Sequence, residues 1–303
     1  MYQPFAGKSV VVTGGGRGIG RATSLQLAEL GAYVVVNDYG VESDGTGADA
    51  SAAQDVVQEI KAAGGDGVAH HGDVSNLDDA QELIQVAVSS TGRLDGVVNN
   101  AGILRDSIFH KMSAEDFNAV LDVHLRGSFN VSRSAATVLR EQGSGVFVHM
   151  TSNSALIGNI AQANYSSAKA GIIGLSRSIA LDMARYSVRS NAVAPTAWSR
   201  LTATIPTNPD EESRADAVKA YGPESVARFV AFLLTDEAKH ITGQVFSVRG
   251  REVHLMSQPR PMRTIIVHED SQIDLADRYR FLSKSLAESR LVPLEESKHV
   301  FPL

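Results

Sequence analysis

The stretch Thr13-Gly14-Gly15-Gly16-Arg17-Gly18-Ile19-Gly20 follows a short apolar run and precedes a segment with helical character. Glycines let a backbone turn tightly and approach a pyrophosphate, whose charge is stabilised by the N-terminus of the following helix. A plain glycine-rich turn is the alternative, but a strand before and a helix after are the context that a dinucleotide loop requires. The stretch therefore predicts a nucleotide site formed by Gly14, Arg17, Gly18, Ile19 and Gly20.

Short β-branched runs alternate with longer helical stretches from the start of the chain to about residue 250. This alternation predicts an α/β fold of the Rossmann type, a doubly wound parallel sheet with helices on both faces. We expect strands at residues 9–13, 33–37, 67–70, 96–98, 146–150, 188–193 and 244–248. We expect helices at residues 19–30, 48–62, 77–90, 114–140, 164–185 and 224–234.

Two expected loops are unusually long, and both leave from the carboxyl ends of strands, where ligands bind in open α/β sheets. They cover residues 39–47 and 196–221. Residues 1–256 are expected to form the catalytic domain, and residues 257–303 a C-terminal extension. Apolar residues recur at helical spacing within 273–286, which predicts a helix packed on the domain or on a neighbouring subunit. A lid over the substrate pocket is the open alternative.

The composition excludes several classes of protein. The chain has 303 residues, a net charge of −6 and no long basic run, which argues against a nucleic-acid partner. No apolar run reaches the length of a membrane span, and residues 1–8 lack the pattern of a signal peptide. The absence of cysteine fits a reducing compartment, so we expect a cytoplasmic protein. His70 and His71 lack partners at ligand spacing, so we expect no metal.

A candidate catalytic group lies in the second half of the chain. Tyr165 and Lys169 are one helical turn apart, so the phenol and the ammonium project from the same face. A nearby ammonium favours the phenolate, which predicts a lowered pKa for Tyr165 and a phenol able to exchange a proton near neutral pH. Ser152, at a strand end upstream, is the candidate for binding the reacting oxygen, with a solvated loop serine as the alternative.

A carboxylate marks the expected ribose site. Asp38 follows the second strand, about twenty residues past the glycine loop, where an acidic side chain accepts hydrogen bonds from the ribose hydroxyls and repels a 2′-phosphate. Arg17 points the other way, because a basic side chain in the loop suits that phosphate. We give Asp38 more weight and expect NAD, with NADP the less favoured cofactor. A turn-forming aspartate is the alternative.

The chain resembles the short-chain dehydrogenases/reductases over residues 7 to about 250. The resemblance is carried by the glycine loop and by Gly72-Asp73-Val74, Asn99-Asn100-Ala101-Gly102, Ser152, Tyr165 with Lys169, Asn191-Ala192-Val193-Ala194-Pro195 and Ile241-Thr242-Gly243-Gln244. It implies that Asp73 contacts the adenine amino group and that Val74 flanks the ring. It also implies that the cofactor cleft is lined by Asn100, Ala101 and Gly102. Lys169 would hold the nicotinamide ribose, and the segment from Pro195 to Trp198 would cap the nicotinamide.

Some of these residues also have a simpler structural explanation. Asp73 is a common start for a turn, and Pro195 is a common end for a strand. His124 stands where the resembled family usually has an asparagine that supports a proton-relay water. A relay role and a buried structural histidine are equally compatible with the sequence.

A narrower resemblance, to the (3R)-hydroxyacyl-CoA dehydrogenase domains of type 2 multifunctional β-oxidation enzymes, rests on residues 35–38, 100–106, 123–129 and 158–166. It implies oxidation of 3-hydroxyacyl-CoA thioesters from fatty acids or steroid side chains, and we expect a homodimer or homotetramer. Three alternatives stay open: another alcohol such as a steroid or sugar, reduction of a 3-oxoacyl carrier protein, and a non-catalytic dinucleotide sensor. Candidate contacts for the CoA phosphates are Arg105, Lys111 and Arg200.

Overall fold

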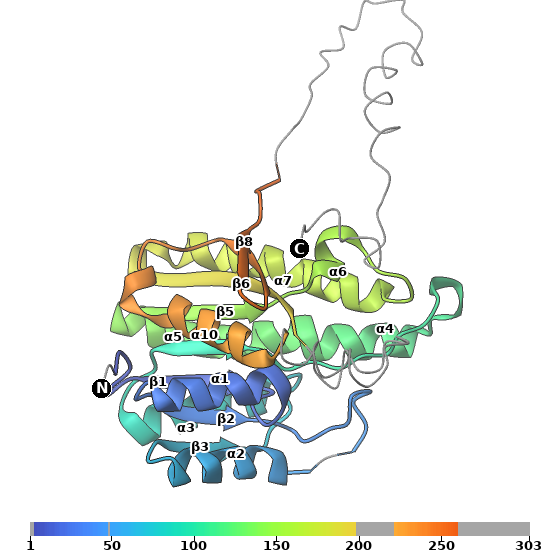
Figure 1. The fold of residues 1–303 in the computed structure, drawn as a ribbon. Coiled ribbons are helices and arrows are strands. Elements are labelled where there is room, and N and C mark those ends of the chain that lie inside the picture. The colour runs from blue at the N-terminus through green and yellow to red at the C-terminus, as the bar shows by residue number, and fades with distance from the viewer. Residues whose placement is uncertain (1–2, 48, 198–220, 260–303) are drawn as a thin grey trace, which may run out of the picture. The chain divides into compact units, whose positions relative to one another are not determined.

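The computed structural model describes residues 3–47, 49–197 and 221–259 (Figure 1). In these residues eight strands form one sheet in the order β3-β2-β1-β4-β5-β6-β7-β8. Their bounds are β1 Ser9–Thr13, β2 Tyr33–Asn37, β3 Asp66–His70, β4 Gly96–Asn99, β5 Gly145–Met150, β6 Val188–Thr196, β7 Val245–Arg249 and β8 Glu252–Leu255. Neighbours from β3 to β7 pair in parallel, and this order is that of a doubly wound fold, which confirms the fold class.

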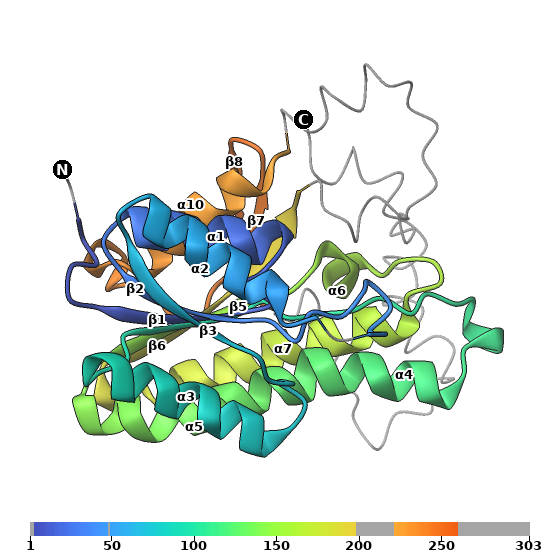
Figure 2. The same cartoon turned by 90° about the horizontal axis from the view of Figure 1, so that it is seen from below.

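Helices cover both faces of the sheet, as Figure 2 shows. On one face lie α1 Gly18–Glu29, α2 Ser51–Ala62 and α10 Pro223–Leu234. On the other lie α3 Leu77–Thr91, α4 Ala114–Leu121, α5 Gly127–Gln142 and α7 Ala163–Asp182. A short helix, α6 Asn153–Ile157, precedes α7, and 3-10 turns span Phe109–Lys111, Ala184–Tyr186 and Asp236–Ala238.

Alternation along the strands builds the two cores. Val10 and Val12 of β1 pack with residues of α1, α2 and α10, whereas Val11 packs with residues of α3 and α5. All three valines are at most 1% exposed, because each face of a parallel sheet is covered by helices. This arrangement explains why the strands read as continuous apolar runs instead of alternating with polar residues.

The structure departs from the sequence prediction at residues 114–140, which were expected to form one helix. Instead α4 and α5 are joined by a π-helical turn at Asp122–Arg126. Such a turn fits an extra residue into the helix, and apolar periodicity does not reveal it. The short helix α6 and the antiparallel edge strand β8, paired with β7, were also not predicted. Residue 48 and the expected helix at 273–286 lie outside the described residues.

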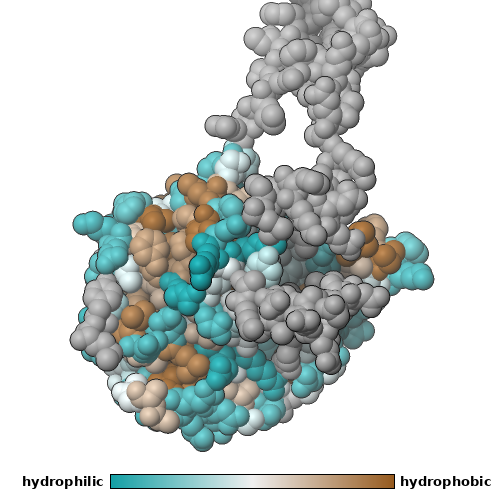
Figure 3. Space-filling view, viewed as in Figure 1, coloured by the Kyte–Doolittle hydropathy of each residue, from teal (hydrophilic) through white to brown (hydrophobic). Residues whose placement is uncertain are grey.

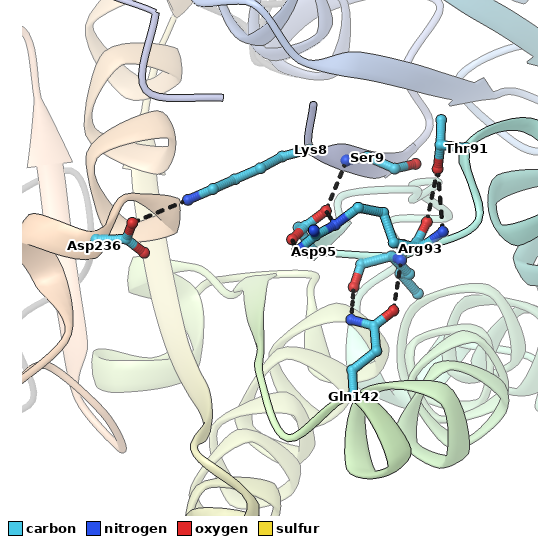
Figure 4. A network of polar contacts seen from close by, with 8 residues as sticks. Lys8, Ser9, Thr91, Arg93, Asp95, Gln142 and Asp236 are labelled. Carbon is cyan, nitrogen blue, oxygen red and sulfur yellow. Dashed lines mark hydrogen bonds and ion pairs between the residues drawn. The ribbon is translucent and has the colours of Figure 1, made fainter. Parts of the chain in front are cut away.

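A polar network ties together the amino ends of the central strands (Figure 4). Asp95, just before β4, accepts a hydrogen bond from the backbone N–H of Ser9 at 2.9 Å and pairs with Arg93. Gln142, at the end of α5, exchanges two hydrogen bonds with the backbone of Leu94, at 2.9 and 2.6 Å. This edge is opposite to the one from which the glycine loop leaves.

The chain divides into a unit of residues Met1–Met256 and a second of Ser257–Leu303, of which the structure describes 257–259. The predicted role of the second unit stays a prediction. Within the described ranges, no helix combines the length and the apolar character needed to cross a membrane.

Candidate functional site

A cavity of about 360 Å³ opens at the carboxyl ends of β1 and β4. These strands are neighbours in the sheet, yet β1 leads to β2 on one side and β4 leads to β5 on the other. Ligands of open α/β folds bind at such a switch point. Most of the predicted cofactor residues line this cavity: Gly14, Arg17, Gly18, Ile19, Asp38, Asp73, Val74, Asn100, Ala101 and Gly102.

The glycine loop lies directly against the end of β4. Gly14 has a φ of 59°, and a Cβ there would come within 2.8 Å of the Ala101 Cα. The Asn100 amide donates hydrogen bonds to the carbonyls of Thr13 and Gly14, each at 3.0 Å. Gly20 is buried in the first turns of α1 and does not line the cavity. The loop therefore has the bare backbone that a pyrophosphate needs for close approach.

Asp38 extends from the end of β2 into the rim of the cavity. Its carboxylate accepts hydrogen bonds from the backbone N–H groups of Gly16 at 2.9 Å and Gly40 at 2.8 Å. These contacts hold the carboxylate beside the loop and leave each oxygen further acceptor capacity for ribose hydroxyls. The Arg17 guanidinium donates to the Val41 carbonyl at 3.0 Å, so it is directed to the loop of residues 39–47.

Asp73 combines a place on the cavity wall with the simpler structural role considered above. Its carboxylate accepts a hydrogen bond from the backbone N–H of Ser75 at 2.8 Å, and its own N–H donates to Asp79 at 2.8 Å. The residue therefore does shape the turn before α3. Val74 is buried next to Gly127 of α5, where a Cβ would come within 2.6 Å of the valine side chain.

The second part of the site lies where β5 ends and α7 begins. Ser152 caps α6 by accepting a hydrogen bond from the Ser154 backbone N–H, and its hydroxyl lies near enough to the Tyr165 phenol to lower the pKa of that phenol. Tyr165 is half-buried, and the buried Lys169 ammonium lies 5.6 Å from the centroid of its ring. The ammonium donates a hydrogen bond to the Met150 carbonyl at 2.7 Å. The structure thus brings together the three side chains that the sequence singled out.

Burial governs the protonation of this group. It raises the pKa of Tyr165, an effect that the hydrogen bond from Ser152 opposes and the charge of Asp106 reinforces. The expectation that Lys169 lowers the pKa of this phenol is therefore wrong for this structure, because desolvation dominates. Burial also lowers the pKa of Lys169 to about 7. The lysine is consequently the group of this pair whose proton exchanges near neutral pH.

His124 lies in the π-helical turn and faces Tyr165. Its Nε2 is 2.8 Å from the Ile103 carbonyl oxygen and 3.2 Å from the Ile103 backbone nitrogen, so this nitrogen donates to the carbonyl in one tautomer of the ring and accepts from the N–H in the other. Burial and the charge of Lys169 lower the pKa of His124 well below its usual value. Its Nδ1 is buried without a hydrogen-bond partner among the described residues. The Ile103 contact fits a structural role and the open Nδ1 fits a relay, so both interpretations keep an observation in their favour.

Of the remaining candidates, Arg105 lines the cavity, whereas the others do not line it or lie outside the described residues. Pro195 pairs with Val248 within the sheet and does not line the cavity. Trp198 and Arg200 lie outside the described residues. The Arg105 guanidinium donates to the Asp44 carbonyl at 2.9 Å and pairs with Asp116 at 3.4 Å, and Lys111 is exposed.

Sequence reasoning missed part of the cavity wall. Loop residues beyond Asp38 complete it on one side, namely Tyr39, Val41, Glu42, Ser43 and Gly45. Their only sequence signal is the length of the loop after a carboxylate at a strand end.

Comparisons with known proteins agree with this geometry. The family model described as enoyl-(acyl carrier protein) reductase matches residues 14–250. A solved short-chain dehydrogenase from Mycobacterium avium superposes with a TM-score of 0.80 at 40% identity, covering 95% of this chain and 98% of that one. The chain belongs to the short-chain dehydrogenase/reductase family. It is accordingly an oxidoreductase that uses a nicotinamide dinucleotide.

Three relatives bear more specific names. Hydroxyacyl-CoA dehydrogenase ChsB1 of Mycobacterium tuberculosis is 43% identical, over 86% of this chain and 82% of its own. The 3-oxoacyl-[acyl-carrier-protein] reductase of a Synechocystis species is 42% identical, over 79% of this chain and 94% of its own. The peroxisomal multifunctional enzyme type 2 of Mus musculus is 40% identical over 86% of this chain, but the match spans only 34% of that longer protein.

Proposed function

We propose that this chain is an NAD-dependent dehydrogenase of (3R)-3-hydroxyacyl-CoA thioesters. The observation that carries the proposal is the placement of Tyr165 at the start of α7, close to Ser152 and one helical turn from the buried Lys169. Support for the acyl-CoA substrate comes from the relative named hydroxyacyl-CoA dehydrogenase. Support for NAD comes from Asp38 at the cavity rim.

The cavity residues fit the cofactor, because a Cβ at Gly14 would fill the space against Ala101 that a pyrophosphate would need. NAD⁺ bound there would supply the acceptor for a hydride from C3 of the substrate. In this proposal the Asp38 carboxylate holds the adenosine ribose, and Ser152 donates a hydrogen bond to the C3 oxygen and fixes its position. Lys169 holds the second ribose beside that oxygen.

Tyr165 removes the hydroxyl proton during oxidation and returns it during reduction. The raised pKa of this phenol means that the ionised form must be stabilised by charges close to it. The Lys169 ammonium lies near enough to contribute once it turns from the Met150 carbonyl. His124, through Nδ1, would pass the proton onward by way of water.

An assay of NADH absorbance with a panel of 3-hydroxyacyl-CoA thioesters tests the proposal. The panel contains both stereoisomers of several chain lengths, together with simple secondary alcohols of matched size. We expect turnover of the 3R thioesters only. Turnover of the simple alcohols with none of the thioesters would refute the proposal and favour a different alcohol substrate.

Reduction of a 3-oxoacyl carrier protein with NADPH is the second candidate. It is supported by the Synechocystis relative and by Arg17 in the glycine loop. The same enzyme preparation assayed with acetoacetyl thioesters and either reduced cofactor separates the two. A strong preference for NADPH would favour the reductase.

Cytoplasmic location, assembly into a homodimer or homotetramer, and the role of residues 257–303 also remain proposals. Deleting residues 270–303 and measuring particle mass and KM tests the last two together. A smaller number of subunits per particle would assign the extension to subunit contacts, and a changed KM with the same number of subunits would assign it to the substrate pocket.

A further inference from the structure

A second polar network lies beside Tyr165, and its residues do not line the cofactor cavity. At its centre is Gln162, which is 6% exposed and lies three residues before Tyr165. Its amide nitrogen donates a hydrogen bond to the Asp106 carboxylate at 2.9 Å. Its amide oxygen accepts hydrogen bonds from Ser154 at 3.1 Å and from Asn159 at 2.8 Å. These contacts determine which way the amide faces and hold one oxygen of Asp106 in place.

The backbone around this network is also clamped. The Ser107 N–H donates to the Ala161 carbonyl at 2.9 Å, and the buried Asn164 amide donates to the Arg105 carbonyl at 2.8 Å. Ala161 has a φ of 63°, which only about a few per cent of non-glycine residues adopt. A positive φ strains the backbone of a non-glycine residue. This strain persists only where the surrounding structure enforces it, and it is common at ligand sites. The strained residue directly precedes Gln162, so the strain helps to aim that side chain.

Asp106 is an exposed residue whose carboxylate is oriented by Gln162. Partial burial raises its pKa, with the hydrogen bond from Gln162 opposing this effect, and its charge is felt by Tyr165. Within the described residues no cation pairs with it: the neighbouring Arg105 binds Asp116 instead. One carboxylate oxygen of Asp106 is held by Gln162, in a loop clamped to the segment just before Tyr165, and the other has no protein donor among the described residues. A carboxylate oriented in this way can accept a hydrogen bond from a ligand.

We propose that Asp106, held by Gln162, accepts a hydrogen bond from an amide N–H of the pantetheine arm of the substrate. The inference rests on the proposed function and assigns a protein contact to the pantetheine arm of its substrate. A 3-hydroxyacyl thioester offers few donors: its C3 hydroxyl meets Tyr165 and Ser152, and the next donor along the chain is the amide N–H beyond the sulfur. Acyl-CoA and acyl carrier proteins share this arm, so both sources satisfy the site.

The surroundings suit the methylenes of such an arm. Ile108 and Phe109 follow Asp106 and are 45% and 78% exposed, and Ile160 in the clamped partner segment is 61% exposed. Figure 3 shows apolar atoms gathered at this margin of the molecule, beyond the start of α4. A polar acceptor flanked by apolar side chains matches a chain in which an amide is flanked by CH₂ groups.

The test compares two thioesters of the same (3R)-3-hydroxyacyl group. One carries N-acetylcysteamine, which keeps the amide, and the other carries an unbranched alkyl thiol of similar length without an amide. We expect the wild-type chain to favour the first in kcat/KM by about 10- to 100-fold, the scale of a hydrogen bond to a charged group. Asp106→Ala should abolish that preference, while Asp106→Asn, which keeps an acceptor oxygen, should retain part of it. Asp116→Asn, at the neighbouring carboxylate, should leave it unchanged.

Equal kcat/KM for the two thioesters in the wild-type chain overturns this inference and leaves the proposed function standing. A preference that survives Asp106→Ala also overturns it. Failure of the wild-type chain to oxidise any 3-hydroxyacyl thioester overturns the proposed function and this inference together. The first comparison needs no variant, so its result does not depend on whether a substituted chain folds.

Discussion

The imidazole of His124 meets the phenol ring of Tyr165 edge-on, with 5.2 Å between the ring centroids and 86° between their planes. The π-helical turn at Asp122–Arg126 brings the histidine to this place, and the missing side chain of Gly102 makes room for it. The turn that carries His124, the backbone at Gly102 and the helix that carries Tyr165 therefore pack against one another beside the phenol. The fit around His124 is tight enough to be tested by adding a single methyl group.

Gly102→Ala should destabilise the fold, because its Cβ would overlap His124 Cε1 and lie 2.9 Å from Nδ1. Overpacking of this kind costs roughly 1–3 kcal/mol, which a thermal melt detects. Gly174→Ala is the matched control, since a Cβ there meets nothing within 4 Å and alanine suits a helix interior. Equal melting temperatures for Gly102→Ala and the wild type would show that His124 moves aside freely.

Tyr165→Phe should lower kcat by roughly 10²- to 10⁴-fold or more, because it removes the group that exchanges the proton of the substrate. The phenyl ring keeps the contact with His124, so the melting temperature and the affinity for NADH should stay close to those of the wild type. Stopped assays of NADH formation and a fluorescence titration measure the two quantities. Tyr186→Phe serves as the control, and full activity in Tyr165→Phe would falsify the assignment.

Asp106→Asn should shift the pH dependence of alcohol oxidation to lower pH. The charged and titratable groups described around Tyr165 are Asp106, Lys169 and His124, and of these Asp106 raises the pKa of the phenol. Oxidation needs the ionised phenol, so removing the negative charge makes that form available at lower pH. Rate profiles at saturating substrate report the shift. An acid limb that stays in place would mean that the charge of Asp106 is screened from Tyr165.

Lys169→Met should change how stability depends on pH. Burial lowers the pKa of Lys169 from 10.5 to about 7 in the fold, so between these values the unfolded chain binds more protons. The contribution of Lys169 to the free energy of unfolding therefore rises with pH between about 7 and 10.5, and it is lowest at pH 7 and below. The variant should lose that rise in chemical denaturation measured at pH 7 and at pH 9. Lys61→Met, at an exposed lysine, should preserve the rise.

Asp38→Ala should weaken the preference for NAD over NADP, because the carboxylate beside Gly16 and Gly40 no longer repels a 2′-phosphate. The ratio of kcat/KM values for the two cofactors measures the change. Asp44→Ala, in the same loop, is the control. If the ratio in Asp38→Ala equals that of the wild type, the ribose contact lies elsewhere.

The positions of the strands from β1 to β7 could be predicted because each strand carries its own signal. Runs such as Val34-Val35-Val36 are buried on both faces, and the glycine loop marks where the first strand ends. The π-helical turn could not be predicted, because apolar spacing on either side of it continues as in a regular helix. Strand β8 alternates half-buried and exposed residues at the sheet edge, a pattern shared with many loops.

The places of Asp38 at the cavity rim and of Tyr165 beside Lys169 could be predicted from local motifs, and their chemical roles stay predictions. The pKa shift of Tyr165 could not be predicted, since its direction depends on burial that the helical spacing to Lys169 does not reveal. The link between Gln162 and Asp106 was missed for a similar reason. It joins segments 56 positions apart, and only the fold shows that they touch.

The network of Asp95, Arg93 and Gln142 braces the amino ends of the strands, on the far side of the sheet from every group assigned a chemical role. The contacts that brace the sheet thus lie at the amino ends of its strands, and the residues proposed to choose the substrate lie at the carboxyl ends. Directed evolution for heat tolerance can therefore target the amino ends of the strands. Libraries meant to change which alcohol is accepted can target the carboxyl ends.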